Sequence, residues 1–150
     1  MVLNPTDLFK SARKAIVSVT VKELAQQAQV KPEILLVEDS IPIRTQMKRI
    51  LESAGYHVTA AVDGEDGFNQ LKVGSFAAVV SDVQMPNLDG LGLTAKIRQF
   101  QEYKDLPVIL VTTLASEEDK RQGKQAGANA YITKGDFEQG VLLDTLRRLI

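Results

Sequence analysis

The sequence predicts an α/β fold in which a doubly wound, five-stranded parallel sheet is covered by helices on both faces. From about residue 33 onward, short apolar runs alternate with segments whose apolar residues recur at helical spacing. Three of the apolar runs lack polar alternation, as burial on both faces requires. Because crossovers between parallel strands are right-handed, this alternation leads to a doubly wound sheet, which binds ligands at the carboxyl ends of its strands.

The first half of the alternation contains two strands and two helices. The first helix is closed by Gly55, and its apolar positions are Ile43, Met47, Ile50, Leu51 and Ala54. The second strand, HVTAAV, alternates between apolar and polar residues, so we expect it nearer an edge of the sheet. The segments are a strand at 33–39, a helix at 42–55, a strand at 57–62 and a helix at 64–74.

The second half contains three strands and three helices. In its first helix, Leu93, Ile97 and Phe100 are expected to share one face. The next helix has Ser116 as N-cap and Asp119 at the third helical position, where a capping box has Glu or Gln. The segments are a strand at 76–82, a helix at 91–102, a strand at 106–113, a helix at 116–127, a strand at 129–133 and a helix at 137–150.

Residues 1–32 do not join this alternation, and we expect them to form an N-terminal extension or linker before a domain at 33–150. The stretch NPTDLFKSARK predicts a short helix capped by Asn4. Thr20 and Glu23 have the spacing of a second capping box. A partly ordered tail is the plainer interpretation.

The composition narrows the class of protein. The 150 residues carry a net charge of -1, which gives no electrostatic footprint for nucleic acid or an anionic membrane. Cysteine is absent, which excludes disulfides and thiolate zinc sites and fits the cytoplasm. No apolar run approaches the roughly 18 residues that a membrane span needs, so we expect no direct insertion into a membrane.

Carboxylates follow two of the predicted strands at the point where each strand ends. Glu38 and Asp39 end the first strand, and Asp82 ends the third. Because such strand ends are neighbours at one edge of a doubly wound sheet, we expect the three side chains to converge. Three anions repel one another, and a hard cation relieves the repulsion. Oxygen ligands without Cys or His favour Mg²⁺ or Mn²⁺ over zinc.

The fourth and fifth strands bring Thr112 and Lys134 to the same edge. A hydroxyl and an ammonium beside a carboxylate and a metal ion can neutralise a transferring phosphoryl group. A carboxylate can itself be the nucleophile and form an acyl phosphate, so the set predicts phosphoryl transfer to an aspartate. Taken singly, each residue has a simpler explanation, because Asp and Thr commonly cap helices and turns and Lys commonly lies in solvent.

Four stretches closely resemble the receiver domains of two-component response regulators. They are LLVEDS at 35–40, SDVQMPNLDG at 81–90, VILVTTLAS at 108–116 and AYITKGDF at 130–137. Their order and spacing match the family across residues 33–150. The resemblance implies a flavodoxin-like fold whose five parallel strands have the order 2-1-3-4-5.

The resemblance also implies a role for each residue at this edge. Asp82 would be the phosphoacceptor, and Lys134 would contact the phosphoryl group. Thr112 would be the switch hydroxyl and Tyr131 the aromatic switch residue, although a half-buried core aromatic is the plainer interpretation of this tyrosine. The ligands of the Mg²⁺ or Mn²⁺ ion would be Glu38, Asp39, Asp82 and the backbone carbonyl of Gln84.

The implied switch has a direct physical cause. Phosphate adds negative charge and acceptor oxygens, so Thr112 gains a strong partner only in the phosphorylated state. Its movement frees space for Tyr131 to turn inward, which changes the surface of the fourth helix, fifth strand and fifth helix. One departure is that Gly135 follows Lys134, where most relatives have a cis proline. A cis bond without proline costs about 3 kcal/mol, so a trans link or unusual strain is expected.

Two further stretches are most similar to receivers fused to the C-terminus of chemotaxis-type histidine kinases: LVTTLASEEDK and KGDFEQ. The start, MVLNPTDLFKSA, is similar to the end of the adaptor-like domain that precedes such receivers. We therefore expect part of a hybrid kinase, phosphorylated by a histidine kinase or phosphotransfer domain and acting on a protein output target. The receiver would catalyse its own phosphorylation without being a turnover enzyme. A stand-alone single-domain regulator is the alternative.

Two other classes of protein share parts of this pattern. A phosphatase with an aspartyl-phosphate intermediate commonly has a second Asp two residues after the nucleophile, where this chain has Gln84, which cannot act as acid or base. A flavin-binding module would need a hydroxyl- or glycine-rich loop after the first strand, where VEDSIPIR offers acids. The single histidine, His57, is expected at the surface rather than in a phosphohistidine relay.

Overall fold

A computed structural model of the chain describes residues 31–134 and 139–150. Its five strands form one parallel sheet with the order β2-β1-β3-β4-β5. The predicted fold class and strand order are confirmed, with the three most apolar strands at the centre and β2 at an edge. The strands are β1 (Glu33–Val37), β2 (His57–Ala61), β3 (Ala78–Ser81), β4 (Val108–Thr112) and β5 (Ala130–Thr133).

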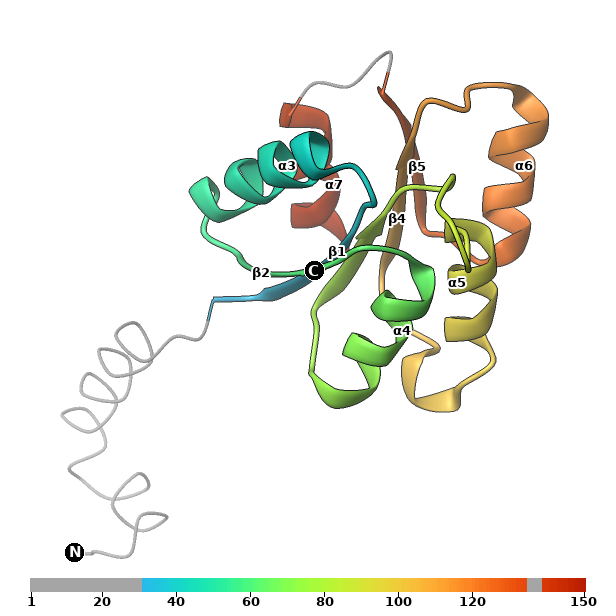
Figure 1. Cartoon of the computed structure of the whole chain (residues 1–150), viewed down its shortest axis with the longest axis horizontal. Helices are drawn as coiled ribbons and strands as arrows, with labels where there is room; N and C mark the ends of the chain where they lie inside the picture. Colours follow the sequence, from blue (N-terminus) through green and yellow to red (C-terminus); the bar gives the residue numbers. More distant parts are fainter. Residues whose placement is uncertain (1–30, 135–138) are drawn as a thin grey trace, which may run out of the picture. The chain divides into compact units, whose positions relative to one another are not determined.

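Helices cover both faces of the sheet (Figure 1). Helices α3 and α7 pack on one face, and α4, α5 and α6 pack on the other. A short 3₁₀ turn, η1 (Gln101–Tyr103), follows α5. The helices are α3 (Ile41–Ser53), α4 (Gly64–Val73), α5 (Gly90–Arg98), α6 (Glu117–Ala126) and α7 (Gln139–Leu149).

The central strands are apolar throughout because both of their faces are buried. In β1, Ile34 and Leu36 point into the core under α3 and α7, whereas Leu35 and Val37 point into the core under α4 and α5. All four side chains have no exposed surface. Each contributes roughly 1.5–3 kcal/mol of hydrophobic stabilisation relative to exposure. This two-sided core fixes the ends of β1 and β3, where the acidic residues stand.

The predicted stop of the first helix at Gly55 is confirmed, although the helix runs over Ile41–Ser53 rather than 42–55. Ser40 caps α3 by accepting a hydrogen bond from the backbone N–H of Ile43, and Gly55 follows the helix with a φ of 99°. Of the predicted apolar positions, Met47 and Leu51 are buried. Ala54 is exposed, because it is already the C-cap residue.

The helix predicted at 91–102 is shorter than expected. It ends at Arg98, because the backbone N–H of Phe100 bonds to Ile97 in a tighter turn and Phe100 itself is extended. The ring of Phe100 lies 5.3 Å from that of Phe68 on α4, in a tilted aromatic pair. The prediction that Phe100 continues the buried helical face was therefore wrong. By contrast, the predicted capping box of Ser116 and Asp119 is confirmed.

Two expectations lie outside the described residues. They are the N-terminal extension, of which residues 1–30 are not described, and the peptide bond between Lys134 and Gly135. The division at residues 32 and 33 therefore stays a prediction. Within 31–134 and 139–150, no helix combines the length and the apolar character that crossing a membrane would require.

Candidate functional site

Three acids meet where the winding of the sheet reverses, between β1 and β3. The two strands pair in parallel with Val37 opposite Ser81, so the residues that follow are neighbours. One carboxylate oxygen from each of Glu38, Asp39 and Asp82 lies within 4.8 Å of the others. The reversal point is where open α/β sheets bind their ligands. The structure thus brings together the acids that the sequence predicted to converge.

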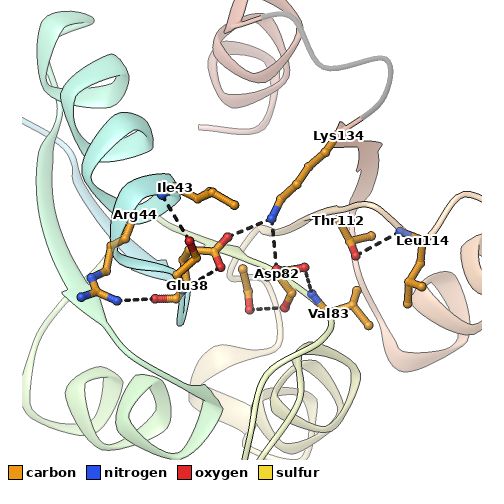
Figure 2. A network of polar contacts seen from close by, with 10 residues as sticks. Glu38, Ile43, Arg44, Asp82, Val83, Thr112, Leu114 and Lys134 are labelled. Atoms are coloured by element: carbon orange, nitrogen blue, oxygen red, sulfur yellow. Dashed lines mark hydrogen bonds and ion pairs between the residues drawn. The ribbon is translucent and has the colours of Figure 1, made fainter.

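Lys134 reaches this cluster from the end of β5 (Figure 2). Its Nζ donates to Oε1 of Glu38 at 3.0 Å and to Oδ2 of Asp82 at 3.1 Å. The side chain of Glu38 is 2% exposed, that of Asp82 11% and that of Lys134 16%. One ammonium therefore pairs with two largely desolvated carboxylates, which would be costly to bury without a partner, and one negative charge remains uncompensated.

The shared ammonium shifts the ionisation of the group. Burial raises the pKa of Glu38, the hydrogen bond from Lys134 opposes this rise, and the charge of Asp82 adds to it. Burial alone would lower the pKa of Lys134, but its hydrogen bonds to Glu38 and Asp82 outweigh burial and raise that pKa above the ordinary value. Lys134 consequently keeps its positive charge at neutral pH.

The loop after β1 orients the first acid through two contacts that were not predicted from the sequence. The backbone N–H of Ser40 donates to Oε2 of Glu38 at 3.2 Å. Nη1 of Arg44, on α3, donates to the backbone carbonyl of Glu38 at 2.8 Å (Figure 2). The sequence could have indicated the contact of Arg44, because this residue stands three positions before the buried Met47 and therefore on the inward face of the helix.

The turn after β3 fixes the orientation of Asp82. Its Oδ1 accepts a hydrogen bond of 2.7 Å from the backbone N–H of Val83, and its carbonyl accepts one of 2.8 Å from the hydroxyl of Ser81. The turn closes where the N–H of Gly90 donates to the carbonyl of Val83 at 2.8 Å. A Cβ atom at Gly90 would lie 2.0 Å from the carbonyl oxygen of Asp82, so a side chain there would force this backbone apart.

Thr112 and Tyr131 are linked through one residue, Leu114. Oγ1 of Thr112, a fully buried residue, accepts a hydrogen bond of 3.3 Å from the backbone N–H of Leu114. The hydroxyl of Tyr131 donates to the backbone carbonyl of Leu114 at 2.8 Å. The ring of Tyr131 packs against α6 at Gly123, where a Cβ atom would lie 2.7 Å from Cδ2 of the ring. The tyrosine is therefore held at both its hydroxyl and its ring.

Comparison with known families decides what kind of domain this geometry serves. The model of the response regulator receiver domain matches residues 34–147, which contain all three acids, Thr112 and Lys134. The chain belongs to this family. Receiver domains accept phosphoryl groups from histidine kinases or phosphotransfer proteins and act on output partners.

Solved receivers share the fold at clear sequence identity. The chemotaxis protein CheY4 of Vibrio cholerae is 35% identical, with a TM-score of 0.75 over 80% of this chain and 99% of that chain. The receiver domain of the sensor histidine kinase PA1611 from Pseudomonas aeruginosa is 34% identical, with a TM-score of 0.74 over 79% of this chain and 97% of that chain. That structure contains a magnesium ion coordinated in its active-site cleft.

A curated relative matches nearly the whole chain. The gliding motility regulatory protein of Myxococcus xanthus is 34% identical over 149 residues, or 99% of this chain and 19% of that protein. The receiver spans less than half the length of the curated relatives compared with it.

The donor atoms of this receiver suit a hard divalent cation. The cluster offers carboxylate oxygens from Glu38, Asp39 and Asp82, and Asp39 is exposed to solvent. Oxygen-only ligands with access to water match the preference of Mg²⁺ and Mn²⁺. Gln84 follows Asp82 by two residues and is exposed, and the role of its carbonyl stays a prediction. His57 is exposed at the start of β2, as expected.

Proposed function

We propose that this receiver is a phosphorylation switch in which Asp82 accepts a phosphoryl group from a phosphohistidine donor. The observation that carries the proposal is the position of Lys134, whose ammonium contacts Asp82 Oδ2 at 3.1 Å inside the acidic cluster. An ammonium already in place needs little reorganisation when negative charge develops on a transferring phosphoryl group. The donor would be a histidine kinase or a phosphotransfer domain, and the cytoplasmic location expected from the sequence stays a prediction.

The transfer requires only one carboxylate of the chain as nucleophile. An oxygen of Asp82 forms a bond to phosphorus while the P–N bond of the donor phosphohistidine breaks. The electron pair of that bond stays on the imidazole nitrogen, which takes up a proton from water. The hydrogen bond from Val83 holds the Asp82 carboxylate in one orientation, and Lys134 faces the oxygens of the new acyl phosphate.

In this proposal Glu38, Asp39, Asp82 and the backbone carbonyl of Gln84 hold a Mg²⁺ or Mn²⁺ ion. When bound, the ion would neutralise charge on the phosphoryl oxygens. The two acids at the end of β1 differ in their surroundings. Glu38 is turned inward to Lys134, whereas Asp39 faces solvent, where an ion and its waters have access.

The switch passes from Thr112 to Tyr131 through the backbone of Leu114. A phosphoryl group on Asp82 gives Thr112 a stronger partner than the N–H of Leu114, which is 3.3 Å away. Movement of Thr112 then changes the loop whose carbonyl holds the hydroxyl of Tyr131. The exposed surface of α6, β5 and α7 carries that change to an output partner.

Acetyl phosphate with Mg²⁺ tests the proposal on the purified chain. We expect a mass gain of one phosphoryl group, lost on hydroxylamine treatment, and no gain in Asp82→Asn. The Thr112→Ala variant should still be labelled but lose the beryllofluoride-induced shift of the Tyr131 amide signal. Labelling that persists in Asp82→Asn would refute the assignment of the acceptor, and an unchanged Tyr131 shift in Thr112→Ala would refute the switch.

We further propose that the chain is part of a hybrid chemotaxis-type kinase. Support comes from the match of nearly the whole chain, residues 1–32 included, to a much longer gliding motility regulator. Receivers of two histidine kinases are also among the similar structures. An immunoblot of the native cells with an antibody to this receiver tests the point. A band much larger than 16.5 kDa is expected, and a band at that mass would favour a stand-alone regulator.

A further inference from the structure

The turn that contains Asp82, between β3 and α5 and here called the acceptor turn (residues 82–89), is hydrogen-bonded to a second turn, between β2 and α4. The second turn supplies no acid to the cluster. Nδ2 of Asn87 donates a hydrogen bond of 2.7 Å to Oδ2 of Asp63, in the turn between β2 and α4. The next residue repeats the contact through the backbone, since the carbonyl of Leu88 accepts from the N–H of Gly64 at 3.0 Å. Two consecutive residues of the acceptor turn therefore bond to two consecutive residues of its neighbour.

Both turns are shaped for this contact. Asn87 has a φ of 68°, a left-handed conformation that Asn adopts more readily than most residues. A Cβ atom at Gly64 would lie 2.2 Å from the carbonyl oxygen of Leu88, so only glycine permits the approach. Asp63 uses both of its oxygens, because Oδ1 caps α4 at the N–H of Asp66 and Oδ2 receives Asn87.

Gln84 lies between two fixed points of the acceptor turn. On one side, the carbonyl of Val83 is held by the N–H of Gly90 at 2.8 Å. On the other side, Asn87 is held by Asp63. Mg²⁺ demands near-ideal octahedral geometry, so a carbonyl ligand must be placed before the ion arrives if affinity is not to be lost in ordering the loop.

We propose that Asn87 and Asp63 are positioning residues whose hydrogen bond holds the turn so that the Gln84 carbonyl faces the acidic cluster. The inference rests on the proposed function, because it assigns Gln84 as a metal ligand. It adds that the edge turn between β2 and α4, which has no ligand of its own, sets the affinity for the ion.

Two variants remove the bond from opposite ends. Asn87→Gly removes the amide but keeps the backbone, since Gly readily adopts positive φ. Asp63→Ser keeps an oxygen to cap α4 but removes the acceptor for Asn87. Because the lost bond is charge-assisted, each variant should raise the Kd for Mg²⁺ about threefold to tenfold. The double variant should be no weaker than the weaker single variant, because both lose the same interaction.

Isothermal titration with Mg²⁺ alone measures the affinity, and amide hydrogen exchange of Gly64 in metal-free protein reports the turn directly. Exchange at Gly64 should accelerate in both variants. Saturating Mg²⁺ should restore the initial rate of labelling by acetyl phosphate. Thr145→Ala, which removes an exposed hydrogen bond of the same 2.7 Å length within α7, is the matched control and should bind Mg²⁺ like the unmodified chain.

The outcomes separate this inference from the proposed function. If the unmodified chain binds Mg²⁺ and both variants bind it equally well, the bond between Asn87 and Asp63 does not position the site. If the effects of the two variants add fully, they act separately and the inference is again wrong. If the unmodified chain fails to bind Mg²⁺ at all, the metal site in the proposed function falls, and the inference falls with it.

Discussion

Tyr131 donates its hydroxyl hydrogen bond to the backbone carbonyl of Leu114, across a distance of 2.8 Å. Its ring meanwhile lies against α6 at Gly123, a buried position in the middle of the helix. Glycine in a helix interior costs up to about 1 kcal/mol relative to alanine, so its presence here calls for a reason. The ring of Tyr131 supplies one, because it occupies the space that a methyl group would need.

Gly123→Ala should therefore displace the tyrosine ring. The added methyl group would lie 2.7 Å from Cδ2 of Tyr131, and the ring must turn away and give up its bond to Leu114. The ring signals of Tyr131 in NMR spectra should shift, without phosphorylation. In a Tyr131→Ala background the same substitution should stabilise the fold by up to about 1 kcal/mol, because the gain in helix propensity is then opposed only by a contact of 3.3 Å with the flexible end of Leu110. Unshifted ring signals would show that the contact between the Tyr131 ring and Gly123 leaves room for a methyl group.

Asp39→Asn should have opposite effects without and with Mg²⁺. Without metal, the variant loses one of three clustered charges, and its free energy of unfolding should rise by about 0.5 kcal/mol, a small gain because solvent screens this exposed side chain. With Mg²⁺, the unmodified chain gains stability from binding, whereas the variant should gain much less. Urea unfolding at several Mg²⁺ concentrations measures both. Parallel responses of the two proteins to Mg²⁺ would contradict a ligand role for Asp39.

Arg98 joins three segments at the opposite end of the sheet from the acids. Its guanidinium donates to the carbonyls of Gly127 and Tyr103 at 3.0 and 2.9 Å and to Oδ1 of Asn129 at 2.8 Å. Arg98→Ala should lower the free energy of unfolding by about 1–3 kcal/mol, because it removes three hydrogen bonds and takes this donor from the carbonyl of Gly127. The other two acceptors keep a second donor each, since the N–H of Val108 bonds to Oδ1 of Asn129 and the N–H of Leu106 bonds to the carbonyl of Tyr103. Arg98→Lys should recover less than half of the lost free energy of unfolding, since an ammonium cannot donate in the planar, multidentate geometry of a guanidinium. Full recovery by lysine in urea unfolding would show that charge alone matters.

The free energy of unfolding should depend on pH in part through the hydrogen bond between Asp63 and Asn87. The hydrogen bond from the N–H of Asp66, followed by that from Asn87, lowers the pKa of Asp63 below its ordinary value of 3.8. Since the folded state has the lower pKa, this stabilisation is fully present above about pH 4 and is lost as the pH falls through the folded pKa. In Asn87→Gly the pKa of Asp63 should move back toward 3.8, as carboxyl NMR titration can measure. An unmoved pKa would mean that Asn87 does not contact Asp63 in solution.

The sequence predicted the sheet and its acidic edge because these depend on local patterns. Uniformly apolar strands, and acids at their ends, are visible in the order of residues alone. The contacts of Arg44 with Glu38 and of Asn87 with Asp63 were not predicted, because each depends on how separate segments pack. The early end of α5 was missed for a similar reason, since the ring of Phe68 that attracts Phe100 lies on another helix.

Glu38 and Asp39 are neighbours in the chain, yet one is sealed in the interior and the other is open to water. The two adjacent acids therefore have different surroundings: Glu38 is paired with the ammonium of Lys134, which is tethered to the protein, and Asp39 faces the solvent from which an ion would reach the cluster. A tethered cation cannot diffuse away, so the inner acid stays compensated whether or not the outer one is loaded. Under the proposed function, loss of the Mg²⁺ ion would therefore still leave the inner carboxylate paired with Lys134.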